Sequence, residues 1–172
     1  MLHRCPSALV STLLAALVNA LFSSSSAAFE PDVPTRVDRS FGPRVTAAVA
    51  DAGRRLERQP CALVLSDFVD SRTGATLAEN LAAKARTASE HVDSLRFLGA
   101  PGPRPFGGRR VFAFTVPASP VVYLCRDDLL RIQNQERLLT AVVIHEVLHT
   151  LGLREDAPTS VAITEQVLAR CF

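Results

Sequence analysis

The sequence predicts an α+β domain, in which a small sheet packs against helices around one central buried helix. Three observations predict it: apolar residues recur at helical spacing, two strand-like runs follow each other closely, and one later segment is apolar almost all round. The 172 residues suffice for one core, and 48% hydrophobic with 21% charged residues is typical of a folded chain. We expect a single domain over residues 42–172.

The first 28 residues have the pattern of a secretory signal. Arg4 supplies a positive start, residues 8–22 are mainly apolar, and Ser26, Ala27 and Ala28 are small. We predict cleavage after Ala28 and an extended lead-in over residues 29–41. The prediction is a secreted or periplasmic protein. An uncleaved anchor is the alternative, but the apolar run is short for a span of roughly 20 residues.

Charge and composition point away from several kinds of partner. Loss of residues 1–28 removes one arginine and no acid, so the formal net charge falls by one from +2. A charge so close to neutral gives no reason to expect nucleic acid or an anionic membrane surface as a partner. We expect no membrane association after signal cleavage, and a monomer.

The cysteines predict one disulfide. Cys5 lies in the predicted signal, which leaves Cys61, Cys125 and Cys171. An oxidising compartment favours one bridge, and three cysteines permit three pairings. We favour Cys61 with Cys171, which would hold the C-terminal helix in place. None of them has the Cys-x-x-Cys spacing of a thiolate zinc site.

The elements before the buried helix follow from periodicity and from turn residues. Residues 44–58 and 75–97 have helical spacing, and residues 99–108 are a loop by their glycines and prolines. Three apolar runs predict strands over residues 62–68, 111–116 and 121–125, and residues 117–120 between the last two suggest a hairpin.

A helical pattern follows Asp127 and Asp128 and ends at Gly152. Its residues 138–151 are apolar on nearly every side, which is typical of a helix in the interior. Gly152 suits the residue after a helix end, where a left-handed backbone is common. Pro158 and Thr159 open a last amphipathic helix. Its expected inner face is Val161, Ile163, Val167 and Leu168.

The buried helix carries His145-Glu146-Val147-Leu148-His149. Residues four apart lie on one helix face, so both imidazoles can reach one tetrahedral metal ion. Polar groups on an apolar helix need partners, because burying them alone costs several kcal/mol. A bound cation is such a partner. A pair of core histidines satisfied by backbone or aspartate is the alternative.

The string from His145 to Glu155 resembles the zincin metallopeptidases, and its His-x-x-Gly continuation looks like the metzincin branch. Together with the following residues to Ser160, it also resembles small exported proteins described as zinc peptidases. The resemblance covers residues 138–171 at most. It implies a zincin-like fold, a Zn²⁺ ion held by His145, His149 and a third ligand, and Glu146 as the general base.

The resemblance places Glu155 at the third-ligand position, where the family usually has histidine and sometimes aspartate. Carboxylate oxygens do bind zinc. Glu165 on the last helix is the runner-up, as in the gluzincin branch, and Asp156 and His91 are weaker alternatives. We expect His91 on the exposed side of its helix. The methionine turn of metzincins is missing, since the chain's one methionine is Met1. Either another residue lies beneath the metal, or the chain is a zincin outside that branch.

These features predict a secreted peptidase that hydrolyses peptide bonds of a peptide or protein substrate by metal-activated water, with Glu146 moving the proton. The resemblance to zincins also implies that an edge strand near the metal helix, over residues 111–116 or 121–125, binds the substrate backbone. The alternative is an exported non-catalytic domain with a structural or degenerate metal site. The intact Glu146 favours the enzyme, because a structural site needs no base.

Overall fold

The computed structural model describes residues 37–101 and 110–172, and the predicted signal and most of the lead-in lie outside them. Its helices are two short 3-10 turns, η1 and η2, and α1 to α7; its strands are β1 to β3. In chain order the elements are η1 (Arg39–Phe41), α1 (Gly42–Leu56), η2 (Cys61–Leu63), α2 (Val64–Asp67), α3 (Leu77–Ala83), α4 (Ala88–Ser94), β1 (Arg96–Gly99), β2 (Ala113–Thr115), β3 (Val121–Leu124), α5 (Arg126–Ile132), α6 (Glu136–Thr150) and α7 (Ser160–Cys171). The α+β class is confirmed.

The sheet is small and mixed, with the strand order β1-β3-β2. β3 pairs in parallel with β1 and antiparallel with β2, and Phe114 lies opposite Tyr123 in the second pair. The two strands expected around residues 117–120 therefore form the predicted hairpin. Because β3 is the central strand, β2 is the edge strand on the side away from β1.

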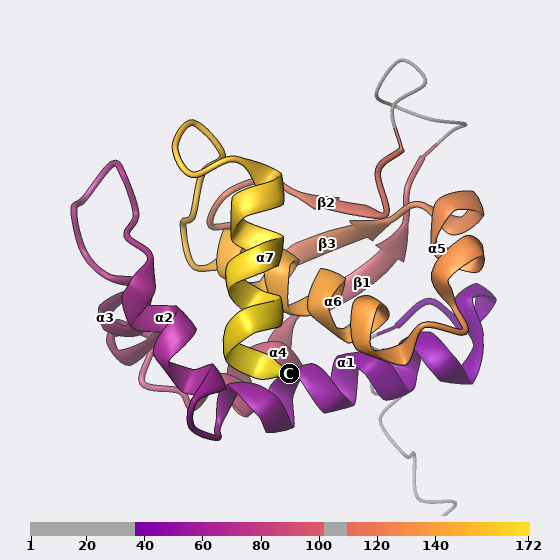
Figure 1. The fold of residues 1–172 in the computed structure, drawn as a ribbon, viewed down its shortest axis with the longest axis horizontal. Helices are drawn as coiled ribbons and strands as arrows, with labels where there is room; N and C mark the ends of the chain where they lie inside the picture. The colour runs from indigo at the N-terminus through magenta and orange to yellow at the C-terminus, as the bar shows by residue number, and fades with distance from the viewer. Residues whose placement is uncertain (1–36, 102–109) are drawn as a thin grey trace, which may run out of the picture. The chain divides into compact units, whose positions relative to one another are not determined.

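α6 is the central helix of the domain. It packs against α1 and α7 and against strands β2 and β3 (Figure 1). Every residue from Leu139 to Thr150 is buried. This confirms the prediction of an interior helix, which begins at Glu136. The helical pattern after Asp128 is interrupted, however, and forms two helices, α5 and α6, separated by residues 133–135.

The strand predicted over residues 62–68 is wrong. The segment forms η2 and α2 instead. Its buried side chains are Cys61, Val64, Leu65 and Phe68, while Leu63 is 40% exposed. That is the i, i+3, i+4, i+7 spacing of a helix face, so the apolar run has a helical period that its shortness concealed.

The single helix predicted over residues 75–97 is also wrong. The segment holds α3 and α4, and then β1. Each helix begins with a capping box, Thr76 with Glu79 and Thr87 with Glu90, in which side chain and backbone satisfy each other's hydrogen bonds. These two Thr-x-x-Glu patterns mark two starts where continuous periodicity suggested one helix.

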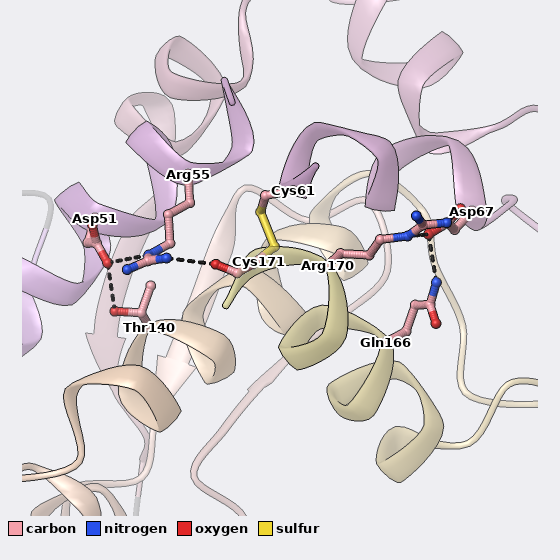
Figure 2. Close-up of a disulfide and its surroundings, with 8 residues drawn as sticks. All are labelled: Asp51, Arg55, Cys61, Asp67, Thr140, Gln166, Arg170 and Cys171. Carbon is pink, nitrogen blue, oxygen red and sulfur yellow. Dashed lines mark hydrogen bonds and ion pairs between the residues drawn. A yellow bond between two sulfur atoms is a disulfide. The ribbon is translucent and has the colours of Figure 1, made fainter. Parts of the chain in front are cut away.

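The C-terminal helix is fastened to the start of the domain. Cys61 and Cys171 form a disulfide across 110 residues, as favoured from the sequence (Figure 2). Cys125 is free. Closing a loop of that length stabilises the fold by about 4–5 kcal/mol in the chain-entropy model. Arg170 and Gln166 on α7 also donate to the Asp67 carboxylate at the end of α2. α7 is thus held firmly at its C-terminal end.

The inner face of α7 differs in part from the prediction. Ile163 and Val167 are fully buried as expected, but Val161 is 66% exposed. Thr159 caps the helix, because its hydroxyl accepts from the backbone N–H of Ala162. Val161 lies in the first turn beyond this cap. None of the described helices is long and apolar enough to cross a membrane.

Candidate metal centre

Three titratable residues of α6 lie in the interior of the domain. His145, Glu146 and His149 are each 5% exposed, on a helix whose other buried residues are aliphatic except Thr140 and Thr150. His145 and His149 are four residues apart and therefore share a face. Their rings meet edge to face, with 4.9 Å between centroids.

A sharp turn follows α6 and brings the chain back toward this face. The Gly152 N–H donates to the His149 carbonyl and the Leu153 N–H donates to the Leu148 carbonyl, which is a Schellman ending. Gly152 has φ of 110°, and a Cβ there would lie 2.8 Å from Oδ2 of the buried Asp70. Only glycine suits this position: its backbone angle requires it, as the sequence predicted, and the structure adds that Asp70 leaves no space for a side chain.

The turn brings Glu155 to the two histidines. Nε2 of His145 and Nε2 of His149 are 3.0 Å apart, and Oε1 of Glu155 is 3.2 Å from each. Within the described part of the chain, these three residues are the group of His, Cys, Asp and Glu side chains that could hold a metal ion. Ligands at 2.0–2.2 Å around a tetrahedral zinc lie about 3.3–3.5 Å from one another. The sides of the triangle, 3.0–3.2 Å, are slightly shorter than these separations.

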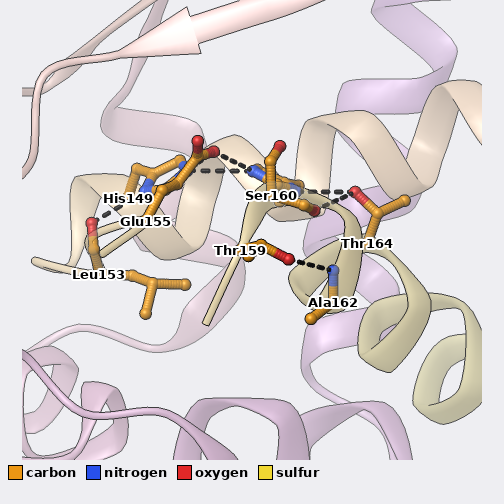
Figure 3. A network of polar contacts seen from close by, with 8 residues as sticks. His149, Leu153, Glu155, Thr159, Ser160, Ala162 and Thr164 are labelled. Atoms are coloured by element: carbon orange, nitrogen blue, oxygen red, sulfur yellow. Dashed lines mark hydrogen bonds and ion pairs between the residues drawn. The ribbon is translucent and has the colours of Figure 1, made fainter. Parts of the chain in front are cut away.

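Hydrogen bonds outside the triangle orient both rings. Nδ1 of His149 is 2.8 Å from the Leu153 carbonyl, which can only accept, so this nitrogen carries a proton (Figure 3). In a neutral ring the lone pair is then on Nε2, inside the triangle. Nδ1 of His145 contacts the Thr164 hydroxyl at 2.9 Å. Metal-binding histidines are typically oriented through the second ring nitrogen in this way.

Burial and charge set the protonation of the group. Burial lowers the pKa of His149, which favours the neutral ring that binds metals. When the rings are protonated, a hydrogen bond from His145, together with the positive charges of the two rings, lowers the pKa of Glu155 to about 2 against the effect of burial. Glu155 is therefore a carboxylate near neutral pH, with its side chain 46% exposed.

Glu146 is next to the triangle and differs from it in environment. Burial raises its pKa to about 7, partly opposed by the charge of His145 and by the Thr115 hydroxyl on β2. Among the described residues, neither Oε2 of Glu146 nor the Thr115 hydroxyl has a partner in good hydrogen-bond geometry. A cation beside Glu146 would favour the charged carboxylate. The side chain is thus a buried carboxyl group with one oxygen free for a further partner.

The other acidic candidates lie outside the triangle. Glu165 on α7 and Asp156 in the turn are exposed, and neither belongs to the cluster around the two histidines. Glu165 instead lines a cavity of about 350 Å³ whose wall includes His145 and Glu146. The rest of that wall is mainly apolar: Arg110, Val111, Phe112 and Ala113, Leu138 and Val142 of α6, and Ser160, Val161 and Thr164 of α7.

The expectation that His91 is a surface residue is wrong. It is 4% exposed, because α4 packs against α1 and its ring faces the end of α6. Its Nε2 lies 2.7 Å from the Thr150 hydroxyl, which donates to the Val147 carbonyl. The ring therefore donates, and its Nδ1 has no partner among the described residues. Burial, with a smaller effect of Lys84 and Arg86, lowers the pKa of His91 to about 4.

His91 should make the domain sensitive to acid. Its pKa of about 4 in the fold is below the ordinary 6.5, so the unfolded chain binds the proton first as the pH falls. The free energy of unfolding is therefore unaffected by His91 above pH 6.5. Between pH 6.5 and pH 4 it falls by about 3 kcal/mol because of this residue. Denaturant unfolding of metal-free wild type and His91→Gln at pH 7 and pH 4 measures it. Equal losses in both proteins would contradict the assignment.

Comparisons with models of protein families, with curated proteins and with solved structures find no match to the chain. By its fold and its site, the protein is an α+β domain with a candidate metal centre. A buried helix and the turn after it bring two imidazoles and a carboxylate together at this centre.

Proposed function

We propose that the protein is a zinc-dependent peptidase with a zincin-like domain. The observation that carries the proposal is the triangle of His145 Nε2, His149 Nε2 and Glu155 Oε1, with sides of 3.0–3.2 Å. With neutral rings these are three acceptors that converge without a donor between them. The lone pairs of these three acceptor atoms repel one another unless a cation lies between them. Two imidazoles and one carboxylate are a known ligand set of catalytic zinc.

The number of ligands favours catalysis over a structural role. Structural zinc sites are closed by four protein ligands, whereas catalytic sites have three and an open position. The cluster in the described residues has three members, and Glu155 is half-exposed. The site is therefore reachable by a small molecule from the side of Glu155. Zinc in an open site acts as a Lewis acid and makes hydroxide available near neutral pH.

Glu146 is the residue that would move the proton. Its carboxylate takes a proton from the attacking water, whose oxygen forms the new bond to the peptide carbonyl carbon. When the carbon–nitrogen bond breaks, Glu146 returns the proton to the leaving amine. The free Oε2 of Glu146 and its place beside His145 on α6 support this role. Glu146 is 5% exposed, and this burial keeps bulk solvent away from its carboxylate.

The edge strand offers a place for the substrate backbone. Of the two strands expected to serve, β3 is central and already paired on both sides, so β2 is the candidate. β2 packs against α6, and its Thr115 lies near Glu146. An extended peptide paired with this edge would direct alternate side chains toward the α6 side of the sheet. The mainly apolar cavity beside His145 and Glu146 would accept one of them.

Export through residues 1–28 remains part of the proposal. It agrees with a Cys61–Cys171 disulfide, because disulfides persist in oxidising compartments. The substrate would then be an extracytoplasmic peptide or protein.

Metal analysis and a cleavage assay test the function. The purified protein is expected to contain about one zinc ion per chain and to cleave members of a peptide library, read by mass spectrometry. A chelator should abolish cleavage and added zinc should restore it. Zinc without cleavage would support the non-catalytic alternative. Absence of any metal at saturating zinc would reject the proposal.

A further inference from the structure

We propose that Thr164 on α7 is a positioning residue for the metal centre, because it sets the tautomer of His145. The inference rests on the proposed metal site and extends it to a second helix. A histidine binds a metal with a nitrogen that carries no proton, so a group that holds the proton on the other nitrogen selects the binding form.

The direction of the hydrogen bonds carries the inference. The Thr164 hydroxyl has one proton, and it donates this to the Ser160 carbonyl one helical turn earlier at 3.1 Å (Figure 3). Its oxygen therefore accepts from Nδ1 of His145 at 2.9 Å. With the proton on Nδ1, a neutral ring has its lone pair on Nε2, which is the nitrogen that faces His149 and Glu155.

The two histidines are oriented by different means. Leu153 orients His149 through a backbone carbonyl, which belongs to the turn after α6 and can only accept. His145 depends on a side chain of α7, whose hydroxyl can rotate and whose role requires the Ser160 carbonyl. Substitution can therefore remove the orientation of His145 alone.

α7 is held well enough for this task. Thr159 caps its N-terminus, and the disulfide at Cys171 and the contacts to Asp67 fix its C-terminal end. Ile163, the neighbour of Thr164, is fully buried against the core. The Thr164 hydroxyl is thus presented from a helix fixed on both sides of it.

Thr164→Val is the direct test. Valine keeps the shape but places a methyl group where the hydroxyl accepts, and the methyl also excludes a substituting water. Zinc affinity, measured by competition with a chromophoric chelator, is expected to fall 10–100-fold, the usual effect of removing such a partner. Thr164→Ser, which retains the hydroxyl, should stay within about threefold of wild type, by the same principle.

Two further measurements separate positioning from stability. In metal-free protein with ¹⁵N-labelled histidine at pH 7.5, NMR should show the Nδ1–H form of His145 in wild type and a mixture in Thr164→Val. Thr87→Ala removes the N-cap of α4 instead, at about 1 kcal/mol of stability, and should leave both zinc affinity and tautomer unchanged.

The result that would overturn the inference is a Thr164→Val protein with wild-type zinc affinity and the wild-type tautomer. An Nε2–H form of His145 in the wild type would overturn it as well. Both outcomes differ from failure of the proposed function, which is a protein that cleaves nothing. The tautomer of the metal-free ring decides the role of Thr164 in that case too.

Discussion

Replacement of Glu146 by glutamine is expected to lower peptide hydrolysis by roughly 10²- to 10⁴-fold, the usual contribution of a general acid–base residue. The amide has the shape of the carboxylate but accepts no proton from water. The loss should appear in kcat, with KM little changed, since the side chain moves a proton and does not hold the substrate. Initial rates over a range of concentrations of one cleaved peptide give both constants.

A control on the same helix makes this result specific. Glu136 lies at the exposed start of α6, outside the cavity beside His145, so Glu136→Gln should have wild-type kinetics. The Glu146→Gln protein should also contain as much zinc as wild type, because Glu146 is not in the metal-holding triangle. Wild-type activity in Glu146→Gln would exclude the proposed mechanism.

Replacement of His149 by alanine is expected to remove the metal and the stability that depends on it. The site then retains one imidazole and one carboxylate. A ligand that binds only the folded chain stabilises it by RT ln(1 + [L]/Kd), about 2.7 kcal/mol at a hundred times Kd. Chelator should therefore lower the Tm of the wild type. The Tm of His149→Ala should be below that of the metal-bound wild type and should not change when chelator is added.

Matched variants distinguish a metal ligand from any buried histidine. His91→Gln changes another buried histidine, which contacts Thr150 and not the triangle, so this protein should keep its zinc and its response to chelator. Glu155→Gln should weaken zinc binding, while Glu165→Gln, with its exposed side chain outside the cluster, should not. Full zinc content in His149→Ala would place the metal elsewhere and reject the triangle as its site.

The Glu146 and His149 variants test different properties, one a catalytic step and the other the metal site. Loss of activity in Glu146→Gln tests a single proton transfer and leaves the metal in place. Loss of zinc in His149→Ala tests the site itself, and metal binding couples to folding because the unfolded chain has no preformed triangle. Measuring both in one set of proteins separates a site that binds but does not catalyse from one that does neither.

What the sequence determined by itself is local. The spacing of His145 and His149 places both on one helix face, the aliphatic residues around them predict burial, and Gly152 marks the turn that follows. All three depend on residues within about one or two helical turns of each other, where backbone geometry alone decides the outcome. The hairpin around residues 117–120 is predictable for the same reason.

Only the tertiary structure decided the rest. β1 is a strand because it pairs in parallel with β3, more than 20 residues away in the chain, and its own four residues carry no such signal. Residues 61–67 are helical because one face meets the core, which a short apolar run does not reveal. His91 is buried because of where α4 packs. Thr164 contacts His145 because α7 packs against α6. Each of these outcomes depends on contacts between segments that are distant in the chain. The free energy of such packing cannot be read from the hydrophobic periodicity of any single helix or strand.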